Sequence, residues 1–218
     1  MSAAIEILDT EGEGALTFRA LAARLATGSG AIYWHVAGKT DLLAAATDEI
    51  ISGAVGGAGS AAVRDTTARA GNGGRNAGPR DAIRAIALGV FDAIDAHPWV
   101  GTQLSGEPWQ PAMLPVFEHI GRELQPLGVP EQAQFDAVSA LVNYILGLAS
   151  QYAAAARLVS PETDRSAFLA TVTARWLDGD PAAYPFVRQI AAQLSDHDDR
   201  EQFLAGIDLI LAGITSLR

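Results

Sequence analysis

Residues 15–41 read ALTFRALAARLATGSGAIYWHVAGKTD, and this segment carries the strongest structural signal in the chain. Thr17 is a suitable N-cap for a short helix, because its hydroxyl can accept a hydrogen bond from an N–H group of the first turn. Apolar residues recur on one face of that helix at helical spacing. The expected buried anchors are Leu21, Ala22 and Leu25, with Leu16 and Ile32 as their partners.

The neighbouring residues extend this helix into a compact group. Small residues at 26–30 favour a tight turn into a third short helix at 31–36. A supporting helix is expected at 3–8, and Thr40 can cap a fourth helix whose apolar stripe reaches Ile51. Two short helices joined by a compact turn, with a supporting helix before them, are typical of a helix-turn-helix that places its second helix in the DNA major groove.

The same segment closely resembles the DNA-binding domain of the TetR family, in particular the branch of the tetracycline repressor. In that branch Tyr-Trp-His-Val recurs at the end of the recognition helix; here it occupies 33–36, and Lys39 follows at the expected interval. The resemblance implies a repressor that binds operator DNA as a homodimer and is released by a small-molecule effector. It also implies an all-α fold, with a helix-turn-helix domain at 1–52 and a larger helical domain at 81–218.

Carried over position by position, the resemblance implies a set of DNA contacts. Those at the start of the second helix would contact a phosphate or a base edge, and the one at the start of the fourth helix would contact a phosphate. Those of the third helix would read bases or hold the DNA backbone. The alternative is that Tyr33 and Trp34 are ordinary core aromatics and that His35 is a surface histidine. The implied DNA-binding residues are Thr17, Arg19, Ser29, Gly30, Ala31, Tyr33, Trp34, His35 and Lys39.

The predicted recognition helix begins with unusually small residues, Gly-Ser-Gly-Ala at 28–31. Bidentate base readout needs Arg, Lys, Asn or Gln, and none is present there. Each glycine also destabilises a helix by about 1 kcal/mol relative to alanine. We therefore expect specificity to depend on Arg19, on thymine-methyl contacts of Ala31 and on DNA shape. The basic residues of 1–52 are only Arg19, Arg24 and Lys39.

Bulk composition limits the class of protein. Of the 218 residues, 49% are hydrophobic and 18% charged, which favours packed helices. There is no cysteine, which excludes disulfides and thiolate metal sites. With no signal peptide and no uninterrupted apolar run of membrane-spanning length, we expect a cytoplasmic protein that does not enter a membrane. The net charge of −10 is unfavourable for binding a polyanion, unless an acidic effector domain accounts for most of it.

Between the two predicted domains, residues 53–80 are rich in glycine and poor in large apolar residues. This composition predicts a flexible linker. Its arginines, Arg64, Arg69, Arg75 and Arg80, outnumber its one acidic residue, Asp65. The segment is therefore either a solvated tether or a basic arm that touches DNA phosphates.

The segment 81–218 predicts amphipathic helices separated by proline and glycine. By the resemblance, helices near 131–159 and 201–217 would pair with their copies in a four-helix dimer interface, unless their stripes face the core of a monomer. Leu141, Ile207, Leu211 and Ile214 would supply apolar area there, and Gly147, Ala149, Gly206 and Gly213 would permit close approach.

An effector pocket is expected between the remaining helices, although ordinary core packing is the alternative for each candidate. No string matches the metal and drug contacts of the tetracycline repressor, so tetracycline is not the expected effector, and no metal or other cofactor is expected. The candidate ligand-binding residues are Phe91, Trp99, Trp109, Met113, Phe117, His119, Asn143, Tyr144, Gln151, Tyr152 and Trp176.

Two other classes of protein compete with a repressor. An enzyme is disfavoured, because the four histidines are scattered and no metalloprotease motif or phosphate-binding loop occurs; we expect no catalytic residues. A helical dimer that has kept the fold but lost DNA binding is the second alternative, favoured by the glycine-rich recognition helix.

Overall fold

The computed structural model describes residues 1–28, 30, 32, 36–70, 78–107, 109–158, 165–195 and 198–217. For residues 58–70, 155–158, 165 and 195 it describes the backbone only. Within these ranges every regular element is a helix, as expected for an all-α fold. The elements are α1 (Ser2–Glu11), η1 (Glu13–Ala15), α2 (Phe18–Arg24), α4 (Lys39–Ala70), α5 (Pro79–Ala96), α6 (Pro98–Gly106), η2 (Pro111–Met113), α7 (Leu114–Leu124), α8 (Glu131–Leu158), α9 (Arg165–Leu177), α10 (Pro185–Ser195) and α11 (Asp199–Thr215).

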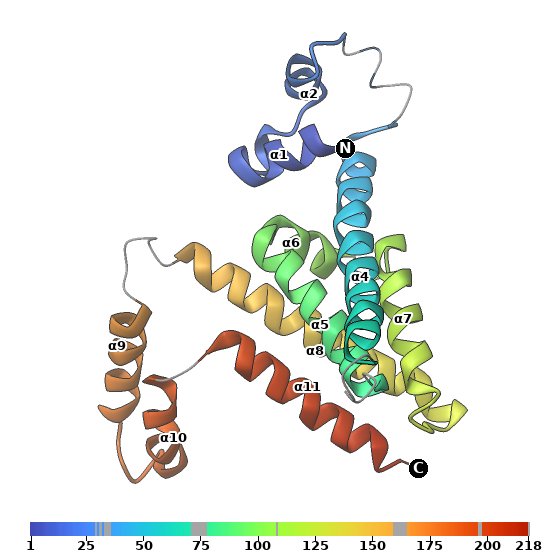
Figure 1. Cartoon of the computed structure of the whole chain (residues 1–218). Coiled ribbons are helices and arrows are strands. Elements are labelled where there is room, and N and C mark those ends of the chain that lie inside the picture. Colours follow the sequence, from blue (N-terminus) through green and yellow to red (C-terminus); the bar gives the residue numbers. More distant parts are fainter. Residues whose placement is uncertain are drawn as a thin grey trace.

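The N-terminal part of the chain, residues 1–52, forms a head at one end of the molecule (Figure 1). Thr17 caps α2 as predicted, since its hydroxyl oxygen accepts from the backbone N–H of Ala20 at 3.1 Å. Of the five predicted core residues, Leu16, Leu21, Ala22 and Ile32 are buried. Leu25 is 53% exposed, so its prediction as a buried anchor is wrong: α2 ends at Arg24, and Leu25 already belongs to the turn.

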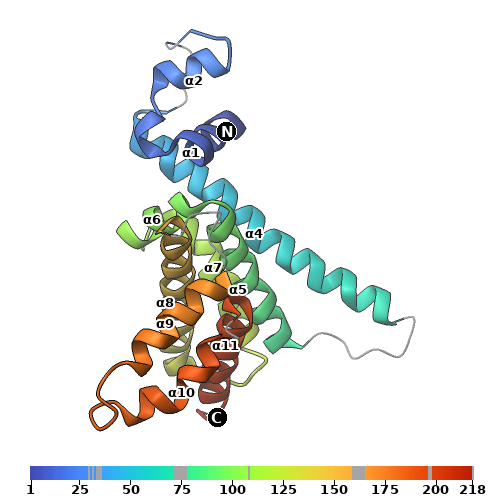
Figure 2. The same ribbon diagram turned by 90° about the vertical axis from the view of Figure 1, so that its left-hand side faces the viewer.

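The long helix α4 leaves the head and crosses the body, and its far end extends beyond the other helices (Figures 1 and 2). It includes residues 53–70, so the prediction of a flexible linker is wrong for that part, whereas 71–77 lie outside the described residues. Each glycine costs only about 1 kcal/mol in a helix, and burial of Ile51 and Val55 offsets that cost. The helix begins at Lys39, so Thr40 lies in its first turn and does not cap it.

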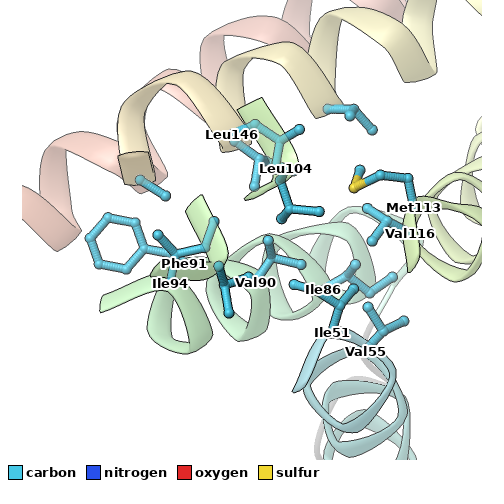
Figure 3. Packing of buried hydrophobic residues seen from close by; sticks show 14 of the residues in the cluster. Ile51, Val55, Ile86, Val90, Phe91, Ile94, Leu104, Met113, Val116 and Leu146 are labelled. Atoms are coloured by element: carbon cyan, nitrogen blue, oxygen red, sulfur yellow. The ribbon is translucent and has the colours of Figure 1, made fainter. Parts of the chain in front are cut away.

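The remaining helices, residues 78–217, form a body around one apolar core. The apolar stripe of α5 is buried, and it meets α4, α6, α7 and α8 (Figure 3). Each large side chain fully removed from water in this way contributes about 1.5–3 kcal/mol. The fully buried large side chains include Ile51, Ile83, Ile94, Leu104, Met113, Ile120, Leu124, Leu141, Ile145 and Phe203.

Ion pairs on the surface join α5 to α11. Arg84 pairs with Asp208, and the Arg200 guanidinium forms a two-point contact with Asp92, whose second bond is 3.0 Å long. The hydrogen bond with Asp92 raises the pKa of Arg200 above its ordinary value. Exposed pairs contribute about 0–1 kcal/mol each, so they fix the register of the two helices more than they stabilise the fold.

The segment Glu131–Ala154 of α8 is long and apolar enough, by length and composition alone, to cross a membrane. Its apolar side chains have another role here, because Leu141, Val142 and Ile145 are buried in the body. A core helix of a helical protein passes the same test, so the feature is weak support for a membrane span.

Helices α9 and α10 form a hairpin at the side of the body (Figure 1). Their main packing is against one another. Large apolar side chains on this hairpin remain exposed, namely Phe168, Trp176, Leu177, Tyr184 and Phe186.

Candidate nucleic-acid interface and effector domain

The structure describes four of the nine predicted DNA contacts, namely Thr17, Arg19, Gly30 and Lys39, and the other five positions, 29, 31 and 33–35, lie outside the described residues. Arg19 lies exposed on α2. The Thr17 oxygen is used for capping. Its O–H remains a donor that a phosphate oxygen could accept.

Acidic side chains hold two of the three cationic side chains of the head. Arg24 pairs with Glu6 and, at 2.9 Å, with Glu11. Lys39 Nζ donates to the Glu13 carbonyl oxygen at 2.6 Å and lies 3.8 Å from Glu13 Oε1. Among the described side chains, Arg19 is the one cation of the head for which we find no ion pair. A phosphate at Lys39 would therefore have to compete with a carboxylate of the protein itself.

Two carboxylates connect the head to the body through α6. Asp9 Oδ1 in α1 accepts from His97 Nδ1 and from Trp99 Nε1, both at 2.8 Å. Glu13 Oε2 accepts from Gln103 Nε2 at 3.2 Å. Sequence reasoning missed this seam, because Asp9 and its partners are 88 and 90 positions apart and no local pattern links them.

Part of the predicted ligand-binding set forms an aromatic cluster between α5, α8 and α11. The ring of Phe91 lies 6.0 Å from Tyr152, centroid to centroid, and 4.7 Å from Phe203, a member that the sequence analysis missed. Tyr144 stacks on Phe203 at 5.8 Å and donates its O–H to the Phe203 carbonyl at 3.3 Å. Partial burial raises the pKa of Tyr144. This cluster joins the helices of one chain.

A second part of the set lines an open groove of about 680 Å³ between α7 and α8. Phe117 and His119 are on its wall, and Trp109, 73% exposed, stacks on Phe117 at 6.1 Å. His119 Nδ1 donates to the Pro115 carbonyl at 2.7 Å, which leaves Nε2 of the neutral ring as an acceptor. The groove is lined by Leu114, Pro115, Phe117, Glu118, His119, Gly121, Gln134, Phe135 and Val138.

The other candidates lie apart from this groove. Trp99 and Met113 are buried in the core, Asn143 and Gln151 lie on the exposed face of α8, and Trp176 is on the α9–α10 hairpin. The structure therefore does not bring the predicted set together into one pocket. Among the described residues, no group of three His, Asp or Glu side chains is placed to hold a metal ion.

The apolar residues predicted for the dimer interface serve the core instead. Leu141, Ile207, Leu211 and Ile214 are buried within one chain. A helix with one strong apolar stripe buries that stripe in the core of its own chain. The prediction that these four residues form the dimer interface is therefore wrong. Gly206 also acts within the chain, because a Cβ there would lie 2.0 Å from Tyr144 Oη.

The outward faces of α8 and α11 carry other side chains. On α8, Ala140, Asn143, Gly147 and Gln151 are exposed. On α11 the exposed residues include Ala205, Gly213 and Leu209, which is 76% exposed. Small residues at these positions leave the helix backbones open to close approach.

Two family models together match most of the chain. Residues 1–46 match the bacterial regulatory proteins of the tetR family, and residues 75–218 match the tetracyclin repressor-like C-terminal domain. The head and the body thus each match a model of their own.

Individual relatives agree with these matches. The solved structure of SCO7222, a TetR transcriptional regulator from Streptomyces coelicolor, is 50% identical and superposes with a TM-score of 0.83, covering 99% of this chain and 95% of that one. An HTH-type transcriptional regulator of Saccharopolyspora erythraea is 31% identical over 153 residues, 69% of this chain. The HTH-type transcriptional repressor DrrR1 of Streptomyces coeruleorubidus is 26% identical over 166 residues, 76% of this chain. The matches span 58% and 54% of the lengths of these last two relatives.

Proposed function

Because the chain belongs to the TetR family of bacterial regulatory proteins, we propose that it is a cytoplasmic transcriptional repressor that leaves its operator when a small molecule binds the body. The observation that carries the proposal is the head. The head contains a helix capped by Thr17, buried apolar anchors and a turn after that helix. These features lie in the segment that matches the family of regulatory proteins. No step of this proposal requires catalysis or a cofactor.

For the DNA interface we propose the nine residues that the resemblance implies. Arg19 and Thr17 at the start of α2, and Lys39 at the start of α4, would contact phosphates. The Tyr-Trp-His-Val string at 33–36 would form the end of the recognition helix, as in the branch of the tetracycline repressor. Two heads would have to meet successive major grooves, about 34 Å apart, so the repressor has to be a two-fold dimer.

For the dimer we propose the outward faces of α8 and α11. The family dimerises, and these faces combine small residues with the exposed Leu209. Close packing of the four helices would follow from the small side chains.

For the effector we propose the groove between α7 and α8. Trp109 and Phe117 offer stacked aromatic surfaces, while His119 and Glu118 supply polar atoms. This lining suits a flat, largely apolar molecule that carries a hydrogen-bond donor. Binding would favour a body conformation in which the two heads no longer match successive major grooves.

The direct test is a mobility-shift titration against DNA from upstream of the protein's own gene, at low and moderate salt. We expect a band that resists non-specific competitor DNA. Lys39→Ala should weaken binding to all sequences and reduce the slope of log affinity against log salt by about 1. Arg175→Ala, which removes an exposed cation from α9, is the matched control and should leave the affinity unchanged.

A second candidate function is a ligand-binding helical dimer whose head no longer binds DNA. It is favoured by the negative charge of the head, because residues 1–52 contain seven carboxylate side chains and only three cationic ones. A folded, dimeric protein that gives no specific band at either salt concentration would select this alternative.

A further inference from the structure

One side chain of the head receives two hydrogen bonds from the body. Asp9 in α1 accepts from His97 Nδ1 and Trp99 Nε1 through the same oxygen, Oδ1, at 2.8 Å each. His97 precedes α6 as its N-cap and Trp99 lies in the first turn of α6. The contact therefore joins one residue of the head to the beginning of one helix of the body.

The Trp99 indole makes this contact consequential. Trp99 is 5% exposed, and its one polar group is the N–H that donates to Asp9. A buried donor that loses its acceptor costs far more than an exposed one, because water cannot replace the partner. Asp9 thus supplies, from the head, the acceptor for the single polar group of a buried side chain of the body.

Helix α6 is also held tightly on its other side. A Cβ on the buried Gly101 would lie 3.0 Å from Ser150 Oγ of α8 and 3.0 Å from Ile94 Cγ2 of α5. A second contact of α6 with the head, from Gln103 to Glu13, lies farther along the same helix. Helix α6 is therefore packed closely against α5 and α8 at Gly101, on the side away from its contacts with Asp9 and Glu13.

We propose that Asp9 is the positioning residue that sets the orientation of the head on the body. Asp9 touches no DNA in this scheme and acts by holding α1 against His97 and Trp99. The inference rests on the proposed function for its effect on DNA affinity, but its effect on head orientation holds independently of DNA.

The experiment measures head orientation directly. The chain has no cysteine, so Ser2→Cys in α1 and Gln125→Cys at the end of α7, both exposed, accept spin labels without background. Pulsed electron paramagnetic resonance, on full-length protein diluted with unlabelled chains, reports the distance between head and body within one protomer. The variants are Asp9→Ala, Asp9→Asn, Trp99→Phe and the control Thr10→Ala, whose hydroxyl donates within α1, to the Glu6 carbonyl.

We expect Asp9→Ala to broaden the distance distribution of the folded protein and to weaken operator binding about tenfold, a typical size for coupling between two sites. Asp9→Asn keeps an acceptor oxygen and should restore a narrow distribution. Trp99→Phe should broaden it, and Asp9→Ala with Trp99→Phe should be no worse than Asp9→Ala alone, because Asp9→Ala already removes the bond from Trp99. Thr10→Ala should match the parent protein.

A narrow, unshifted distribution in folded Asp9→Ala and Trp99→Phe would overturn the proposal, even if their melting temperatures fall, because the contact would then be merely structural. If Asp9→Ala does not fold, Trp99→Phe and Asp9→Asn decide the question by the same readout. Failure of the proposed function gives a different pattern. In that case the parent protein shows no specific DNA band, while the distance distributions still respond to the variants.

Discussion

At the scale of single residues, the contact between Lys39 and Glu13 determines how much charge the head can offer to DNA. Lys39 Nζ lies 3.8 Å from the Glu13 carboxylate, which Gln103 holds from its other side. A phosphate that approaches Lys39 also approaches this carboxylate and is repelled by it. With Lys39 as a phosphate contact, as we propose, Glu13 would lower the affinity of the head for DNA.

We therefore predict that Glu13→Gln strengthens DNA binding. The amide can still accept from Gln103, and Lys39 keeps its bond to the carbonyl oxygen of residue 13. Its positive charge, however, is no longer offset by a carboxylate. Titrations across a salt series should show a steeper slope of log affinity against log salt, by up to about 1, and the gain in affinity should be largest at low salt. Glu49→Gln removes the same charge from an exposed position on α4 and is the control. Weaker binding by Glu13→Gln would mean that Glu13 orients Lys39 for the phosphate instead of competing with it.

Single residues also show where sequence reasoning works. Thr17 as a cap and Leu16 and Leu21 as core residues follow from local rules, and the structure agrees. Asp9 could not be predicted, because its role depends on two donors from a distant part of the chain. Local chemistry is readable from sequence, whereas contacts across the seam between head and body require the fold.

At the scale of helices, α4 shows why composition misleads. Its glycines suggested a linker, yet the helix continues to Ala70. Gly53, Gly56 and Gly57 would meet no atom within 4 Å of an added Cβ, so nothing about packing demands them. The apolar residues before and among them, Ile51 and Val55, determine the outcome by their burial.

The packing of α8 on α11 gives the opposite case, a glycine that the structure requires. A Cβ on Gly206 would lie 2.0 Å from Tyr144 Oη and 2.3 Å from its Cζ. We predict that Gly206→Ala lowers the free energy of unfolding, because the Tyr144 ring must leave its stack on Phe203; overpacking of this kind costs about 1–3 kcal/mol.

Urea denaturation measures the effect of Gly206→Ala. Gly53→Ala, in open space on α4, is the matched control and should be neutral or stabilise by up to about 1 kcal/mol. Equal stability of the two alanine variants would show that Tyr144 moves aside without loss, so that the stack on Phe203 contributes little.

At the scale of the whole molecule, some large apolar side chains of the body remain exposed to water and are not covered by the core of the same chain. The large apolar side chains with most exposure on α8 and α11 are Phe135 at 63% and Leu209 at 76%. The pair of helices that we propose for the dimer is the pair that the family resemblance implies. The side chains predicted for the interface were the wrong ones, because sequence periodicity reveals only the stronger apolar stripe of each helix. The stronger stripe of each helix is buried in its own protomer.

We predict that Leu209→Lys weakens the homodimer. Burying this leucine between copies of α11 would contribute about 1.5–3 kcal/mol, and an unpaired lysine there adds a desolvation cost, so the dimer dissociation constant should rise at least about tenfold. Sedimentation velocity across a dilution series measures the change. Leu114→Lys, on α7 and 67% exposed, is the matched control and should leave the dimer intact. The reverse result, with Leu114→Lys dissociating the dimer and Leu209→Lys leaving it whole, would place the interface at the groove between α7 and α8. That groove could then not serve as an open effector site, since each copy would cover the other's.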